Sequence, residues 1–306
     1  MIAPLRIGTR GSRLALWQAN FVADRLRAAC GAKSVELVEI ETAGDQVRDA
    51  PLSQIGGDGL FTKAIQQALL SHSIDVAVHS LKDLPTLPVA GLVLAAVPPR
   101  ASIADVFVSQ KHARFDDLPE SAVVATGSLR RRAQVLHRRP DLRLVNVRGN
   151  VETRLRKLAE ENLDGLILAQ AGLERLGLGD AITEILDPSW MLPAVGQGAL
   201  GLECRSDDAA ARQLLALLDS WPTHQAVLAE RAFLRTLGGG CLVPIGAVTT
   251  IDADTLALRG VVLSPDGTRR CDGRTQGRVT EAEMVGEQLA TDLLEKGAGE
   301  ILQGIP

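Results

Sequence analysis

Cys241 is the residue best suited to covalent chemistry, because it directly follows Gly238, Gly239 and Gly240. Glycine has no Cβ, so a bulky group can approach the neighbouring sulfur closely, and Pro244 stiffens the chain beyond it. The simpler alternative is a small buried apolar residue, which is the commonest role of a lone cysteine. We interpret Cys241 as a covalent attachment point, and this interpretation depends on what the rest of the chain places around it.

A second chemical group is the carboxylate of Asp83, which lies in the segment His79–Pro85 directly after a predicted strand. The neighbouring Lys82 favours the ionised form of this carboxylate. A carboxylate in a cationic cleft can donate or accept protons and can stabilise a passing cation. A loop aspartate can also simply accept hydrogen bonds from nearby N–H groups, and the residue type and position alone leave both roles open.

Arginines gather at three turns, 10–12, 126–128 and 148–150, where a predicted strand passes into a predicted helix. A helix N-terminus beside a guanidinium group is a good binding site for a carboxylate or a phosphate. The alternative is a solvated basic surface. Ligands of open α/β sheets bind at the carboxyl ends of the strands, which favours an anion site. The residues concerned are Arg10 and Ser12, then Ser128, Arg130 and Arg131, then Arg148 and Arg154.

The basic residues are concentrated in one part of an acidic chain. The 306-residue protein has a net charge of −4, whereas segment 128–157 contains nine arginines and Lys157 against Asp141 and Glu152, which is ten positive charges minus two, or +8. Such a segment indicates an anionic ligand. Nucleic acid is a poor candidate, because the whole chain is acidic, contains no tyrosine and is only 3% aromatic.

Other functional classes are not favoured. The glycine pattern at 196–201 matches a dinucleotide-binding motif but precedes a strand instead of a helix, so we reject it. His72 and His79 have no nearby set of ligands, so we predict no metal, and His79 reads as a structural residue at a strand end. No apolar run is long enough for a membrane span. Four widely spaced cysteines and an N-terminus without signal-peptide features predict a cytoplasmic protein.

Strands and helices alternate through most of the chain, which predicts α/β units with mainly parallel sheets. Proline-containing segments suggest crossovers, and they divide the chain into 1–98 with 193–218, then 99–192, then a smaller α+β unit at 219–306. Within the second unit we expect a short helix at 180–185.

Seven motifs resemble those of the porphobilinogen deaminase (hydroxymethylbilane synthase) family. They are TRGSRLALWQA at 9–19, GLFTK at 59–63, AVHSLKDLP at 77–85, SLRR at 128–131, RGNVETRL at 148–155, LPAVGQGA at 192–199 and GGCLVPIG at 239–246. The resemblance implies two type II periplasmic-binding-protein-like α/β domains around a cleft, with the α+β unit as a third domain. It also implies a monomeric transferase of tetrapyrrole (haem) biosynthesis.

In this family four porphobilinogen molecules join head to tail on a covalently bound dipyrromethane cofactor, with release of ammonia and then of hydroxymethylbilane. The resemblance makes Cys241 the attachment site and Asp83 the catalytic carboxylate. It implies that Lys82, Asp83, Ser128, Arg130 and Arg131 bind the cofactor, and that Arg10, Ser12, Phe61, Arg148, Arg154 and Arg175 bind substrate. Every pyrrole ring carries two carboxylates, which accounts for the basic segment.

The chain departs from the family pattern at five positions, none of which is an expected catalytic or tethering residue: Arg13, Ala64, Gln66, Gly127 and Leu242. A competing hypothesis is a non-enzymatic two-lobed receptor or effector domain for a small polycarboxylate. It explains the arginines and the fold equally well, but it gives no role to the glycine run before Cys241.

Overall fold

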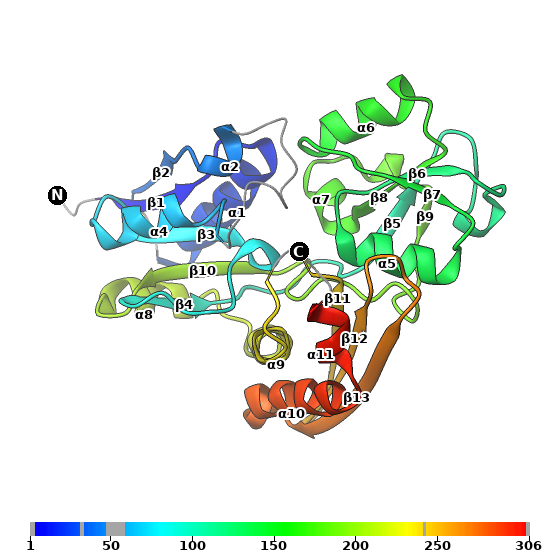
Figure 1. The fold of residues 1–306 in the computed structure, drawn as a ribbon. Coiled ribbons are helices and arrows are strands. Elements are labelled where there is room, and N and C mark those ends of the chain that lie inside the picture. Colours follow the sequence, from blue (N-terminus) through cyan, green and yellow to red (C-terminus); the bar gives the residue numbers. More distant parts are fainter. Residues whose placement is uncertain (1–3, 31–33, 47–58, 241–242, 304–306) are drawn as a thin grey trace.

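The computed structural model describes residues 4–30, 34–46, 59–240 and 243–303. Three sheets organise these residues (Figure 1). Two five-stranded sheets form two lobes that lie side by side, and a three-stranded sheet with its helices lies below them in that view. We call these parts the first lobe, the second lobe and the C-terminal unit.

The first lobe is built around a sheet of strand order β2-β1-β3-β10-β4. Its strands are β1 (Leu5–Thr9), β2 (Val35–Glu39), β3 (Val76–Ser80), β4 (Leu92–Ala96) and β10 (Leu200–Arg205). Its helices are α1 (Arg13–Cys30), α2 (Ala43–Gln46), α4 (Lys63–Leu70) and α8 (Ala209–Ala216), and a 3-10 turn, η1 (Leu81–Asp83), follows β3 directly. β10 comes from late in the chain, as predicted from its apolar sequence.

The second lobe is built around a sheet of strand order β7-β6-β8-β5-β9. Its strands are β5 (Asp105–Val108), β6 (Val123–Ala125), β7 (Arg143–Val145), β8 (Gly165–Ala169) and β9 (Glu184–Ile185). Its helices are α5 (Leu129–Arg138), α6 (Val151–Glu160) and α7 (Gln170–Arg175), with 3-10 turns η2 (Phe115–Asp117) and η3 (Gly179–Ala181).

Both lobes have the same topology. In each sheet four strands run in one direction and a single strand, β10 or β5, runs in the other. Numbered within its own lobe, each sheet has the order 2-1-3-n-4, where n is the reversed strand. The predicted fold class is therefore confirmed: two type II periplasmic-binding-protein-like α/β lobes with mainly parallel sheets, and a smaller α+β unit.

The C-terminal unit is an antiparallel meander covered by helices. It contains β11 (Ile245–Asp252), β12 (Thr255–Leu263), β13 (Arg270–Arg278), α9 (Trp221–Thr236), η4 (Val279–Glu281), α10 (Ala282–Glu295) and α11 (Ala298–Gln303). Phe233 of α9, Leu258 of β12 and Leu289 of α10 belong to its buried core. Arg231 of α9 donates a hydrogen bond to the Leu84 carbonyl of the first lobe, so the C-terminal unit directly contacts the site described below.

Local sequence explains why the helices of the second lobe begin at the sheet edge. The Ser128 hydroxyl accepts a hydrogen bond from the Arg131 N–H at the start of α5, and the Asn150 side chain accepts one from the Thr153 N–H at the start of α6. These N-caps satisfy backbone donors that a helix leaves unpaired. The polar turns after the strands therefore start helices there, with the arginines in their first turns.

One predicted element needs correction. The segment 180–185 is not a helix, because η3 ends at Ala181 and β9 pairs antiparallel with β5, with Ile185 opposite Val106. The Thr183 N–H also donates to the Phe107 carbonyl at 3.0 Å, so pairing at the sheet edge overrides the weak helical pattern of this segment. The short helix α11 was not predicted, and its Ala298 and Ile301 complete the core of the C-terminal unit.

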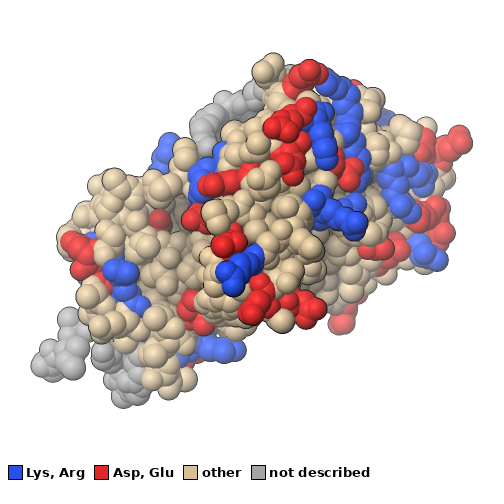
Figure 2. Space-filling view, turned by 90° about the horizontal axis from the view of Figure 1, so that it is seen from below, with Lys and Arg blue, Asp and Glu red and all other residues tan. Residues whose placement is uncertain are grey.

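The basic segment is less cationic than its composition indicates. Five of its nine arginines form ion pairs within the chain: Arg130 and Arg131 with Asp105, Arg138 with Asp116, Arg139 with Asp141, and Arg156 with Glu160. Figure 2 shows acidic and basic side chains interspersed on the face seen from below. Among the helices in the described ranges, none has both the length and the apolar composition of a membrane span.

Candidate active site

The centre of the candidate site is the turn η1, which follows the buried strand β3. Leu81 is buried, and its N–H donates to the Ala199 carbonyl at 3.0 Å, which fixes the start of the turn. The Leu84 N–H donates to the Leu81 carbonyl at 3.2 Å and closes it. Lys82 and Asp83 are only partly buried, so the turn, which these hydrogen bonds hold in place, presents an ammonium group and a carboxylate.

One cavity beside this turn brings together four residues that the sequence singled out. Arg10, Ser12, Phe61 and Asp83 line it, at the carboxyl ends of β1 and β3 and between α1 and α4. The Arg10 guanidinium lies 4.1 Å from the centre of the Phe61 ring, as in a cation–π contact. This cavity therefore combines a carboxylate, a guanidinium, a hydroxyl and an aromatic face.

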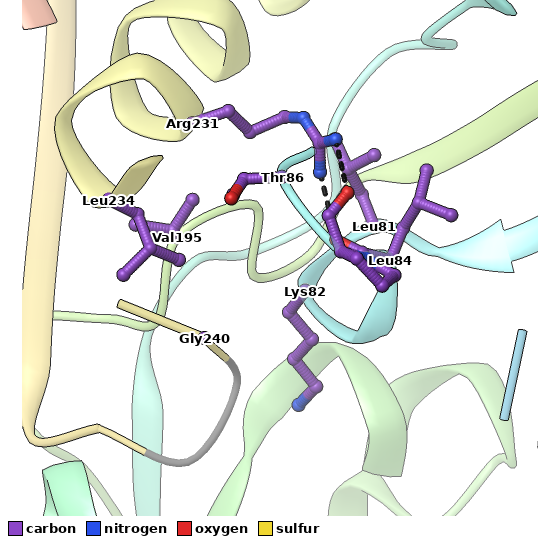
Figure 3. A pocket seen from close by; sticks show the side chains of 9 residues that line it. Leu81, Lys82, Leu84, Thr86, Val195, Arg231, Leu234 and Gly240 are labelled. Atoms are coloured by element: carbon purple, nitrogen blue, oxygen red, sulfur yellow. Dashed lines mark hydrogen bonds between the residues drawn. The ribbon is translucent and has the colours of Figure 1, made fainter. Parts of the chain in front are cut away.

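A second cavity lies on the other side of the same turn (Figure 3). Lys82 lines it, and so does Gly240, the residue directly before Cys241. Cys241 itself lies outside the described residues. In Figure 3 Lys82 extends from the turn toward the ribbon of the second lobe. The end of the glycine run is therefore close to the turn that carries Asp83.

Arg130 and Arg131 point into the second lobe. Arg130 donates to Asp105 at 2.6 Å and to the Leu192 carbonyl at 2.6 Å, and Arg131 donates to Asp105 at 3.0 Å and to the Ile167 carbonyl at 3.1 Å. Burial alone would raise the pKa of Asp105, but the charges of the two arginines hold it well below its usual range. Their role in binding a cofactor stays a prediction, because Asp105 already occupies much of their hydrogen-bonding capacity.

Three other predicted arginines have no carboxylate within ion-pair distance in the described part of the chain: Arg148, Arg154 and Arg175. Arg154 donates to the Gly149 carbonyl at 2.8 Å, and Arg175 donates to the Gly198 carbonyl at 2.7 Å. Burial lowers the pKa of Arg154 to about 10 and that of Arg175 to about 10. Partly buried cations without a carboxylate partner can form ion pairs with an anionic ligand.

The two lobes meet electrostatically at this point. Burial and the charge of Arg131 together lower the pKa of Lys82 to about 8, although the charge of Asp83 opposes the shift. Asp83 likewise raises, and Arg131 and Arg148 lower, the pKa of Arg154. Residues 82 and 83 of the first lobe are therefore close enough to the arginines of the second lobe to interact with them.

Some residues near the site had no sequence signal that assigned them there. Glu203 of β10 accepts hydrogen bonds from Gln66 at 3.0 Å and lies 3.1 Å from Nε2 of His79, with all three side chains buried. The only hint was a charged residue within an apolar strand. Asp105 and Arg231 also had none, because their partners are 25 to 147 residues away along the chain.

Fold and site together define a class: a two-lobed α/β protein in which the turn of Lys82 and Asp83 borders two cavities, one of them lined by Arg10 and Asp83. A family model described as porphobilinogen deaminase, dipyromethane cofactor binding domain, matches residues 5–213, and the corresponding C-terminal domain model matches residues 224–295. The chain belongs to the porphobilinogen deaminase family.

Curated relatives agree with this assignment. A porphobilinogen deaminase from Pelotomaculum thermopropionicum is 52% identical over 299 residues, covering 98% of this chain and 96% of the relative. One from Geobacter metallireducens is 51% identical and covers 97% and 93%. Among solved structures, a nutrient binding protein from Burkholderia cenocepacia bound to methionine is similar at 12% identity and a TM-score of 0.43, covering 71% of this chain and 92% of that one.

Proposed function

We propose that this protein is a hydroxymethylbilane synthase: a transferase that joins porphobilinogen units head to tail and releases ammonia and linear hydroxymethylbilane. The observation that carries the proposal is the position of the turn η1. It presents Asp83 to the cavity with Arg10, Ser12 and Phe61, and Lys82 to the cavity that Gly240 borders. The rival polycarboxylate receptor has no comparable support.

The residues present suit a dipyrromethane group attached to Cys241, which when bound supplies the primer for chain growth. Gly240, the residue before Cys241, lines the same cavity as Lys82, and Arg148, Arg154 and Arg175 are cations without an ion-pair partner in the described part of the chain. Cys204 and Cys271 are both buried, and burial raises the pKa of each thiol, to about 11 for Cys204, which disfavours the reactive thiolate. These observations support Cys241 as the attachment site.

The chemistry assigned to the side chains follows from charge. When the C–N bond of the protonated aminomethyl group of porphobilinogen breaks, nitrogen leaves as ammonia with the bonding pair and the ring becomes a cation. The Asp83 carboxylate would stabilise that cation until a new C–C bond replaces the broken C–N bond, and the proton displaced from the attacked pyrrole would pass to the released ammonia. Arg10, Ser12 and Phe61 would orient the incoming ring, and tethering would make each addition intramolecular.

We also propose the chain's organisation and setting. The first domain comprises 1–98 and 193–218, the second 99–192 and the third 219–306, which agrees with the distribution of strands among the three sheets. The protein would act as a cytoplasmic monomer on a small-molecule substrate, without nucleic acid, membrane or metal. Within the described residues, no group of three or more His, Cys, Asp or Glu side chains is arranged to hold a metal ion.

Intact mass and turnover test this proposal together. The purified chain should carry an addition of dipyrromethane size that Cys241→Ser loses and Cys271→Ser keeps. Asp83→Asn should keep the addition and the fold but lower kcat by about 100-fold or more, because the stabilising charge is lost. An unmodified wild type that binds polycarboxylates without turnover would support the receptor instead, and near-normal rates in Asp83→Asn would exclude Asp83 from the mechanism.

A further inference from the structure

Arg231 of α9 reaches from the C-terminal unit to the turn that carries Lys82 and Asp83. Its guanidinium donates to the Leu84 carbonyl at 2.9 Å and to the Pro85 carbonyl at 2.7 Å, the first two residues after Asp83. Figure 3 shows both hydrogen bonds and the side chain spanning the gap between helix and turn. Hydrogen bonds from a charged donor are stronger than neutral ones, and two parallel donors also fix orientation.

The helix that carries Arg231 also leads to the glycine run. After α9 ends at Thr236, the Gly238 N–H donates to the Arg235 carbonyl at 3.0 Å and the Gly239 N–H to the Leu234 carbonyl at 3.0 Å. Gly239 packs so closely that an added Cβ would lie 2.7 Å from the Leu234 side chain and 2.9 Å from that of Ile245. The path from Arg231 to Gly240 is therefore held by helix, turn and packing.

The position of α9 is fixed separately by Glu230, the residue directly before Arg231. Glu230 is fully buried, forms a bidentate ion pair with Arg100 at 2.7 and 2.9 Å, and accepts the Gly196 N–H at 2.8 Å. Both partners lie in segments that connect the two lobes. Glu230 thus anchors the helix to the connections, and Arg231 is left to set the position of the turn relative to the helix.

We propose that Arg231 is a positioning residue, which holds the turn of Lys82 and Asp83 at a fixed distance from Gly240, the residue before Cys241. The inference rests on the proposed function, in which Asp83 acts on a chain attached at Cys241. The cavity between them is bounded by the turn on one side and by Arg231, Leu234 and Gly240 on the other. Without the two hydrogen bonds, the Asp83 carboxylate would no longer be held at a fixed position relative to the group proposed to be attached at Cys241.

The chain offers a matched control one turn along the same helix. Arg235 contacts Glu283 at 3.3 Å and Glu287 at 3.2 Å, both on α10 of the C-terminal unit. Removing Arg235 takes a guanidinium from α9 without touching the turn. Arg231→Met removes the two hydrogen bonds to Leu84 and Pro85, and Arg235→Met leaves both in place.

The experiment measures the first addition of porphobilinogen to the full-length, cofactor-loaded protein in a single turnover, by rapid quenching and intact mass. A single-turnover rate constant does not depend on the fraction of active protein, so partial unfolding does not mimic the effect. Arg231→Met should slow the addition by about 10- to 100-fold with KM changed less than about threefold, because the reacting geometry is displaced while the substrate-binding arginines remain. Arg235→Met should stay within about twofold of wild type, and Arg231→Lys should fall between.

An Arg231→Met rate within about twofold of wild type would overturn the inference, and so would an equal loss in Arg235→Met. If Arg231→Met does not fold, Arg231→Lys decides, and a wild-type rate in that variant overturns it. A wild type without attached cofactor or turnover would refute the proposed function and this inference with it. Wild-type turnover with unaffected Arg231 variants would refute the inference alone.

Discussion

At the scale of single residues, the site is determined by which charges are paired within the protein and which are left for a ligand. Arg130 and Arg131 are expected cofactor-binding residues, yet both form ion pairs with the buried Asp105. Arg154 of α6 donates to the Gly149 carbonyl and has no carboxylate within ion-pair distance among the described residues. Counting arginines in the sequence could identify the segment, but the assignment of each guanidinium needed the positions of the acids.

The low pKa of Lys82 gives a direct test at this scale. In Cys241→Ser, which cannot carry the cofactor, the ammonium should lose its proton with a midpoint near pH 8, because burial and Arg131 disfavour the charge. Acylation of Lys82 by an amine-selective reagent, followed by peptide mass mapping from pH 6 to 11, should therefore rise around that pH, with the exposed Lys63 as reference for reagent reactivity.

The lowered pKa of Lys82 also makes the stability of the folded protein depend on pH. The pKa in the folded protein lies below the unfolded value of 10.5, so the charged lysine costs stability fully below about pH 8, and the cost disappears as the pH rises through 10.5. A labelling midpoint above pH 10 would contradict the burial seen around Lys82.

At the scale of elements, the sequence predicted nearly all helices and strands, because apolar runs and polar turns alternate strongly in both lobes. It could not place Asp105 at the start of β5 against the first turn of α5, a contact between residues 25 and 26 positions apart. The segment 180–185 was misread for the same reason. Its structure is decided by pairing with β5 and not by its own residues.

Asp105 holds α5 against the second sheet, so its removal should be costly. Asp105→Ala leaves two buried guanidinium groups without their carboxylate and should lower the free energy of unfolding by about 3–5 kcal/mol. The control is Asp116→Ala, which removes the exposed partner of Arg138 and should cost less than about 1 kcal/mol. Urea denaturation of the two variants measures both values, and similar midpoints would show that the buried pair adds little.

At the scale of the whole molecule, the C-terminal unit contacts both lobes. Arg231 fastens it to the turn of the first lobe, and the loop between β12 and β13 meets α5 of the second, where Gly267 accepts a hydrogen bond at 2.9 Å from Nδ1 of His137. On the opposite side of the connections, Arg13 of α1 pairs with Glu152 of α6 at 3.1 Å across the lobes. Arg13, a departure from the family pattern, therefore has a partner that only the folded chain reveals.

Gly267 allows a test of the contact between the C-terminal unit and the second lobe. Its φ is +75°, and an added Cβ would lie 2.5 Å from the backbone nitrogen of His137 and 2.7 Å from the carbonyl oxygen of Ala133. Gly267→Ala should cost about 1–2 kcal/mol for the left-handed backbone and about 1–3 kcal/mol more for the overlap. Gly297→Ala, with φ +92° and nothing within 4 Å, should show only the first cost. Thermal or urea unfolding measures both variants. Equal decreases in the unfolding midpoint for Gly267→Ala and Gly297→Ala would show that the loop between β12 and β13 moves away from α5 at little cost.

The two connections between the lobes, 97–104 and 186–199, run alongside each other. The Ala101 N–H donates to the Gly198 carbonyl at 3.2 Å, Arg100 donates to the Gln197 carbonyl at 2.7 Å, and Gln197 donates to the Ile103 carbonyl at 2.8 Å. Because hydrogen bonds join these two segments to each other, we expect the lobes to move apart mainly by rotation about them. Any separation of the lobes would then be smallest beside these two segments and greatest at the points farthest from them.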